Sequence, residues 1–178
     1  MNAVVVYESM FGDTREVAEA LARGLGRHTN VAVVNVNDVG DGFPVADLVL
    51  VGAPTHVHGL SSPATRNEAV RWTEDPSRKL TLEHEAPGIG VREWIGGLSG
   101  KPGGFVAFDT RADAMELLTG SAGKHIEKAL KKAGGQPLSD VESFLVHEGE
   151  LNSGELDRAE AWGDELGRKL PVAGPVAG

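Results

Sequence analysis

Short apolar segments, separated by amphipathic stretches, constrain the fold of this chain more than any other feature. The apolar segments are Ala3–Tyr7, Val31–Val36, Leu48–Ala53, Gly104–Phe108 and Val141–Val146. Runs of this length without regular polar alternation are typical of strands that are buried on both faces of a parallel sheet. The pattern therefore predicts five strands in one parallel sheet.

The segments between these strands carry apolar residues at helical spacing. In Thr14–Arg27, for example, Val17, Leu21 and Leu25 fall on one face. Similar stripes predict helices at Ser121–Ala133 and Ser153–Leu170, and two more helices are expected around Pro63–Thr73 and Ile89–Leu98. Strands that alternate with helices form right-handed crossovers. We therefore predict an α/β fold, a doubly wound three-layer sandwich whose five parallel strands have the order 2-1-3-4-5.

The length of 178 residues corresponds to one domain, which we place at residues 1–170. Within it, Leu60–Gly103 is longer than a simple crossover needs and is interpreted as an embellished third crossover. Residues 171–178 are rich in proline, glycine and alanine and are expected to form a flexible tail. The start of the chain does not resemble a signal peptide, and no apolar run is long enough for a membrane span. We expect a cytoplasmic protein.

Composition excludes several classes of function. The chain has no cysteine, which rules out disulfides, thiolate metal sites and cysteine nucleophiles. Its net charge of −9 disfavours nucleic acid and anionic membranes as partners. An acidic surface suits partner proteins with basic surfaces, and the alternative interpretation is that the charge only aids solubility. The sequence also lacks the glycine-rich dinucleotide fingerprint, the Walker A loop and the Gly-x-Ser-x-Gly elbow.

Ligands of open α/β sheets bind outside the carboxyl ends of the strands, where the strand order reverses. The first loop at this edge is Glu8–Thr14, which leads directly into a helix. Backbone amides at a helix N-terminus attract anions, and a glycine such as Gly12 lets the backbone approach a ligand closely. An ordinary turn with a helix cap is the alternative interpretation of this loop.

Two further loops are predicted at the same edge. Gly52–Gly59 follows the third strand, and Phe108–Arg111 follows the fourth. His56 and His58 could together face a metal, but no third ligand is identifiable and we predict no metal site. The indoles of Trp94 and Trp162 could form an aromatic lid, although burial in the core is the interpretation we prefer.

The residues of these loops resemble a known family. The run Tyr7–Thr14 is similar to the phosphate-binding loop of flavodoxins, and most of all to the flavodoxin domains of flavodiiron proteins. Pro54-Thr55-His56 is similar to the loop that contacts the flavin ring in that family. Phe108–Arg111, with Arg92-Glu93-Trp94, Gly154-Glu155 and Trp162-Gly163, resembles a group of actinobacterial flavodoxin-domain proteins. The resemblance covers residues 1–170 and implies a flavodoxin-like fold with one non-covalent FMN.

The resemblance also implies which residues contact the cofactor. They are Ser9, Met10, Phe11, Gly12, Asp13, Thr14, Pro54, Thr55, His56, Val57, Asp109, Thr110 and Arg111. Two departures from the family pattern stand out. Asp13 replaces the usual asparagine and places a carboxylate beside the expected phosphate, and the tyrosine that usually stacks on the flavin is absent from the third loop.

Function follows from the same resemblance as an expectation. It implies an electron carrier that uses FMN and exchanges electrons with redox partner proteins. One alternative is an FMN-dependent oxidoreductase of the quinone reductase or protoporphyrinogen oxidase type, and another is a flavin-free interaction domain. Arg111 bears on this choice, because a guanidinium beside the pyrimidine edge of the flavin would stabilise the reduced anion and favour two-electron chemistry. No catalytic residue is assigned.

Overall fold

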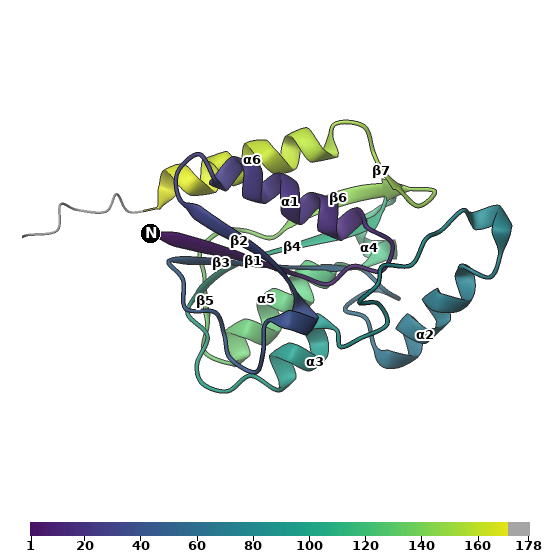
Figure 1. Ribbon diagram of the computed structural model, residues 1–178, viewed down its shortest axis with the longest axis horizontal. Helices are drawn as coiled ribbons and strands as arrows, with labels where there is room; N and C mark the ends of the chain where they lie inside the picture. Colours follow the sequence, from purple (N-terminus) through teal and green to yellow (C-terminus); the bar gives the residue numbers. More distant parts are fainter. Residues whose placement is uncertain (171–178) are drawn as a thin grey trace, which may run out of the picture.

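A computed structural model describes residues 1–170, and the predicted tail at 171–178 lies outside the described residues. The centre of the protein is a twisted sheet between two layers of helices (Figure 1). The five long strands are β1 (Asn2–Tyr7), β2 (Asn30–Asn35), β3 (Leu48–Pro54), β4 (Gly104–Ala112) and β6 (Glu142–His147). All neighbouring pairs among them are parallel, and their order is β2-β1-β3-β4-β6. The predicted topology is therefore confirmed.

The sheet is larger than predicted by two short strands. β5 (Gln136–Pro137) pairs with the start of β4, and β7 (Glu150–Leu151) pairs antiparallel with the end of β6. Two-residue strands leave no periodic signal in the sequence, so the apolar pattern could not reveal them. The β6–β7 hairpin lies at the carboxyl edge of the sheet.

Helices cover both faces of the sheet. α1 (Asp13–Leu25) and α6 (Glu155–Lys169) lie side by side on one face, and α3 (Val91–Gly96) and α5 (Ala122–Lys132) lie on the other (Figure 1). Successive strand residues alternate between the two cores: Val5 and Leu50 face α1 and α6, whereas Val6 and Val51 face α3 and α5. This alternation is the period of two that an extended strand imposes.

α1 and α6 approach each other through glycines. A Cβ on Gly24 would lie 2.0 Å from the Glu160 carbonyl oxygen, and one on Gly163 would lie 2.3 Å from that of Leu21. Trp162 packs against the core on this face of the sheet and Trp94 packs in the opposite core, which confirms the preferred interpretation of both indoles. No helix of residues 1–170 is long and apolar enough to cross a membrane.

The embellished crossover forms a lobe beyond the carboxyl edge of the sheet. It contains α2 (Pro63–Trp72) and the short 3-10 helix η2 (Pro76–Arg78), and its chain returns to α3 (Figure 1). Ser62 begins α2 with a reciprocal capping box, in which its hydroxyl and that of Thr65 each bind the other's backbone amide.

One expectation about the carboxyl edge is wrong. Residues 108–111 do not form a loop, because β4 continues to Ala112. The strand is held on both sides, by β3 up to Thr110 and by β6 up to Ala112. Only after Ala112 does the chain turn away toward the short helix α4 (Glu116–Thr119).

Candidate functional site

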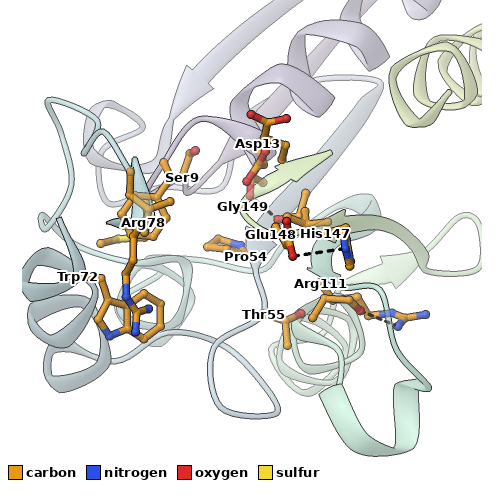
Figure 2. A pocket seen from close by; sticks show the side chains of 18 of the residues that line it. Ser9, Asp13, Pro54, Thr55, Trp72, Arg78, Arg111, His147, Glu148 and Gly149 are labelled. Atoms are coloured by element: carbon orange, nitrogen blue, oxygen red, sulfur yellow. Dashed lines mark hydrogen bonds and ion pairs between the residues drawn. The ribbon is translucent and has the colours of Figure 1, made fainter. Parts of the chain in front are cut away.

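A cleft of about 890 Å³ opens at the carboxyl edge of the sheet. Its floor is the loop after β1 together with the ends of β3 and β4. One wall is the segment Trp72–Leu80 of the lobe, and the opposite wall is the β6–β7 hairpin (Figure 2). The position matches the crevice that the reversal of strand order predicts.

The loop after β1 owes its shape to Gly12. This residue is the N-cap of α1 and has a φ of 110°, in the left-handed region that favours glycine. The Ser9 hydroxyl accepts a hydrogen bond from the Gly12 amide at 3.1 Å, which closes the turn. The hydroxyls of Thr14 and Thr110 lie 2.7 Å apart and join the start of α1 to β4.

Four amides of this loop are free to bind a ligand. Among the described residues, no acceptor faces the backbone N–H groups of Met10, Phe11, Asp13 or Thr14. The first amides of a helix have no partner within the helix, and the macrodipole of α1 adds partial positive charge at the same point. Because the residues of this loop line the cleft, the arrangement suits an anionic group such as a phosphate.

Asp13 places a carboxyl group beside these free amides. It is the first residue of α1 and lines the cleft, but it does not cap the helix, since no side chain caps the N-terminus. Burial, with repulsion from Glu16 and Glu150 among its neighbours, raises the pKa of Asp13 to about 6. A hydrogen bond from the Leu151 amide in β7 acts in the opposite direction and lowers the pKa of Asp13. This contact places the carboxyl group beside the β6–β7 hairpin.

We expect Asp13→Asn to stabilise the flavin-free protein at pH 8. A raised pKa in the folded state makes ionisation destabilising, so stability falls as pH rises from about 4 through about 6. After allowance for solvent screening of a half-buried group, the gain should be ~1 kcal/mol at pH 8 and should vanish below pH 4. Urea unfolding at both pH values measures it. Asp157→Asn, an exposed carboxylate in the first turn of α6, is the matched control; an equal gain there would contradict the explanation.

The end of β3 supplies the neighbouring part of the floor. Pro54, Thr55 and His56 line the cleft, and the backbones of His56 and Gly59 exchange two hydrogen bonds that form a tight turn. Burial, followed by the charge of Arg66, lowers the pKa of His56 to about 4. The imidazole is therefore neutral at neutral pH and can lie against an uncharged aromatic ligand. Val57, at the turn's tip, is 78% exposed and does not line the cleft.

Alternation along β4 sends Asp109 and Thr110 to opposite faces. Thr110 lies on the α1 side and lines the cleft. Asp109 faces α5, where its carboxylate accepts hydrogen bonds from the Ser121 hydroxyl at 2.5 Å and the Gly123 amide at 2.8 Å. Asp109 thus anchors the N-terminus of α5 instead of lining the cleft, because residues 108–111 are strand and not loop.

Arg111 reaches the cleft only with part of its side chain. Its Nη1 donates to the Ala114 carbonyl at 2.7 Å and approaches that of Ala112 at 3.5 Å. Figure 2 shows the guanidinium directed away from Pro54 and Thr55. The Arg111 guanidinium therefore binds main-chain carbonyls at the end of β4 and just beyond it.

Ten of the thirteen residues predicted to contact a cofactor line one cleft; Gly12, Val57 and Asp109 do not. Sequence reasoning missed both walls. Their lining residues are Trp72, Ser77, Arg78, Lys79, Leu80, Ala112, Val146, His147, Glu148, Gly149 and Glu150. Two signals were present in the sequence: a basic pair, Arg78-Lys79, in an acidic chain, and the glycine Gly149 within a short polar stretch between Val146 and Leu151.

Fold and site together define a doubly wound α/β protein with a cleft at its switch point that is lined by unpartnered amides of a helix N-terminus. Comparison with known proteins gives the family. The sequence model described as Flavodoxin matches residues 5–162. The chain belongs to the flavodoxin family, as its sequence resemblance implied. No curated protein matches the chain significantly.

Solved structures agree on the fold at low sequence identity. Oxidised Flavodoxin 1 from Bacillus cereus has a TM-score of 0.66 at 14% identity, over 96% of this chain and 100% of that one. A flavodoxin from the domain Archaea has a TM-score of 0.62 at 18% identity, over 96% and 99% of the two chains. The flavodiiron core of Flv1 from Synechocystis sp. has a TM-score of 0.57 at 17% identity, and 36% of its chain is covered.

Proposed function

We propose that this protein binds one FMN non-covalently in the cleft and acts as an electron carrier between partner proteins. The observation that carries the proposal is the set of free amides at the N-terminus of α1, which line a cleft large enough for a cofactor. Membership of the flavodoxin family supports FMN as the cofactor. When bound, FMN supplies the redox chemistry, and the protein sets its binding and its potential.

Each part of the cleft has a role in this proposal. The amides of Met10, Phe11, Asp13 and Thr14 bind the phosphate, and the hydrogen bond from the Gly12 amide to the Ser9 hydroxyl holds those amides in place. Thr55, the neutral His56 ring and Thr110 line the remaining floor and contact the flavin ring. The acidic surface, with a net charge of −9, favours redox partners with basic surfaces.

The position of Arg111 favours the carrier over a two-electron oxidoreductase. A guanidinium at the flavin edge would stabilise the negative charge of the reduced cofactor. The charge of Arg111 instead faces the Ala112 and Ala114 carbonyls, which attenuate its field toward the cleft.

We expect Arg111→Gln to change the two-electron midpoint potential of the FMN-loaded protein by less than ~15 mV. A stabilisation of ~1.4 kcal/mol would correspond to ~30 mV for a two-electron couple, and the observed orientation should give less than half of that. Spectroelectrochemical titration measures the potential, with Lys101→Gln as a control that removes one exposed positive charge elsewhere. A decrease in midpoint potential of 30 mV or more that occurs in Arg111→Gln and not in the control would favour the oxidoreductase.

The decisive experiment for the cofactor is a visible absorption spectrum of the purified protein, followed by titration of the apoprotein with FMN. We expect flavin bands in the spectrum. The titration should show one FMN bound per protein chain, with a micromolar or lower dissociation constant. Failure to bind FMN would refute the proposal and favour the flavin-free interaction domain. Stopped-flow mixing of the reduced protein with a one-electron protein acceptor and with a quinone then distinguishes a carrier from an enzyme.

A further inference from the structure

The wall formed by Trp72–Leu80 is fastened to the anion-binding loop. The rings of Phe11 and Trp72 stack with their centroids 6.4 Å apart and their planes 22° apart. Farther along the lobe, the Glu83 amide donates to the Met10 carbonyl at 2.9 Å, and Glu83 pairs with Arg15 at 2.7 Å. These contacts join the lobe to the loop on two sides, so the wall has a defined place next to the free amides.

The same wall meets the opposite one at its end. Gly149, at the tip of the β6–β7 hairpin, has a φ of 88°, and a Cβ added there would lie 3.2 Å from Leu80 Cδ2. The hairpin backbone and the Leu80 side chain therefore touch. Trp72–Leu80 is part of the enclosure of the cleft and not a separate surface feature.

Cations and carboxylates line different parts of the enclosure. Arg78 and Lys79 come from the lobe, whereas Asp13, Glu148 and Glu150 come from α1 and the hairpin. In Figure 2, Arg78 and Trp72 lie on one side of the cleft, and Glu148 and Arg111 on the other. Arg111 is already held by main-chain carbonyls. The lobe thus provides the only other arginine or lysine side chains among the described residues that line the cleft.

These two cations are available to a ligand. Lys79 forms no ion pair with any described residue. The Arg78 guanidinium lies 5.2 Å from the centre of the Trp72 ring and 3.6 Å from Asp75, in a pair whose side chains are about half exposed. Exposed pairs of this kind contribute little stability, so Arg78 can exchange Asp75 for a stronger anion at small cost.

An anion at the N-terminus of α1 would be subject to two opposing electrostatic forces. The free amides attract it, but Asp13 places a carboxyl group in the same cleft. A phosphate monoester carries up to two negative charges near neutral pH, and repulsion from an ionised Asp13 opposes its binding. A cation within reach of the site would offset that repulsion.

We propose that Arg78 and Lys79 bind the phosphate monoester of the ligand and compensate for Asp13. The inference rests on the proposed function, since FMN supplies the phosphate. It assigns to the embellished crossover a role in ligand selection: the pair should distinguish FMN from riboflavin, which has the same ring and no phosphate. Trp72 supports this role by holding the Arg78 side chain against the wall.

The test compares FMN and riboflavin on one apoprotein. Arg78→Gln combined with Lys79→Gln should weaken FMN binding about 10-fold in 50 mM salt and leave riboflavin binding within 2-fold of wild type. The matched control is Lys131→Gln with Lys132→Gln, which removes two consecutive lysines in the last turn of α5. This variant should change neither affinity. The charge-conserving exchange Arg78→Lys with Lys79→Arg should keep most of the preference for FMN.

Each other outcome overturns the inference. Unchanged FMN affinity in the double variant removes the pair from the phosphate site. Equal weakening of FMN and riboflavin assigns the pair to the shape of the wall and not to charge. A wild-type protein that binds FMN no better than riboflavin also overturns the inference but leaves the cofactor proposal standing. A wild-type protein that binds neither flavin refutes the proposed function itself.

Discussion

Gly12→Val should weaken FMN binding at least 100-fold while the protein stays folded. The reason is the backbone and not the room for a side chain. A Cβ at this position would have only ordinary contacts, with Arg15 Nη2 at 3.5 Å and Glu83 Oε1 at 3.6 Å. The φ of 110°, however, is essentially closed to a β-branched residue and costs ~1–3 kcal/mol when it is imposed.

The chain can relieve this strain only by rotating the loop at Gly12. That rotation breaks the hydrogen bond from the Gly12 amide to Ser9 and turns the amides of Phe11 and Asp13 away from the cleft. Loss of two or three charge-assisted hydrogen bonds accounts for the expected ~3 kcal/mol or more, which is a 100-fold change in affinity.

Gly100→Val is the control for Gly12→Val. Gly100 also has a left-handed φ, 87°, and a Cβ there has nothing within 4 Å, but it lies in the turn before β4, outside the cleft. The control should lose a similar amount of stability and keep its affinity for FMN. Apoprotein titration followed by flavin fluorescence measures both variants, and wild-type affinity in Gly12→Val would remove the loop from the binding site.

The strands, helices and topology could be predicted from the sequence because buried elements leave local apolar patterns in it. Strands such as Leu48–Ala53 are buried on both faces and read as unbroken apolar runs, and α1 shows its buried stripe through Val17, Leu21 and Leu25. Topology then followed from the rules for right-handed crossovers. Because the carboxyl edge of such a sheet holds the ligand, the floor of the cleft could be predicted too.

The walls could not be predicted in the same way. They are built by segments far apart in sequence, and no local pattern reports that Leu80 touches Gly149 or that Trp72 stacks on Phe11. The error at β4 has a different origin. Polar residues after Phe108 suggest a loop, but pairing with β3 and β6 continues the strand and turns Asp109 toward α5. Tertiary pairing overrode local polarity there.

A buried polar network next to the cleft is the second place where large effects are expected. Glu8, directly after β1, is 3% exposed, accepts a hydrogen bond from the Ser61 hydroxyl, and accepts another from the Val91 amide at 2.8 Å. The buried Arg66 donates to Ser61 at 2.8 Å and pairs with Glu93 at 3.0 Å. The network thus joins β1 to α2 and α3.

We expect Glu8→Ala to lower the free energy of unfolding by ~3 kcal/mol. It leaves the Val91 amide and the Ser61 hydroxyl buried without their acceptor, and it leaves Arg66 with Glu93 alone. Removing one member of a buried charged network costs ~3–5 kcal/mol, and partial relaxation places this case at the lower end. Urea unfolding at pH 7 measures the loss, with Glu85→Ala, an exposed neighbour of the same type, as the control.

Glu8→Gln separates the hydrogen bonds from the charge. Burial is the largest influence on Glu8 and raises its pKa above the usual value for glutamate, 4.5. A carboxyl with a raised folded pKa stabilises most in its protonated form, so the wild type should lose stability as pH rises above about 4.5 toward the folded pKa. Glutamine can still accept from Val91 and donate to Ser61, so Glu8→Gln should lose less than ~1 kcal/mol at pH 7 and show a flatter pH profile. An equal loss in Glu8→Gln and Glu8→Ala would mean that the ionised carboxylate itself, paired through Ser61 with Arg66, holds these three elements together.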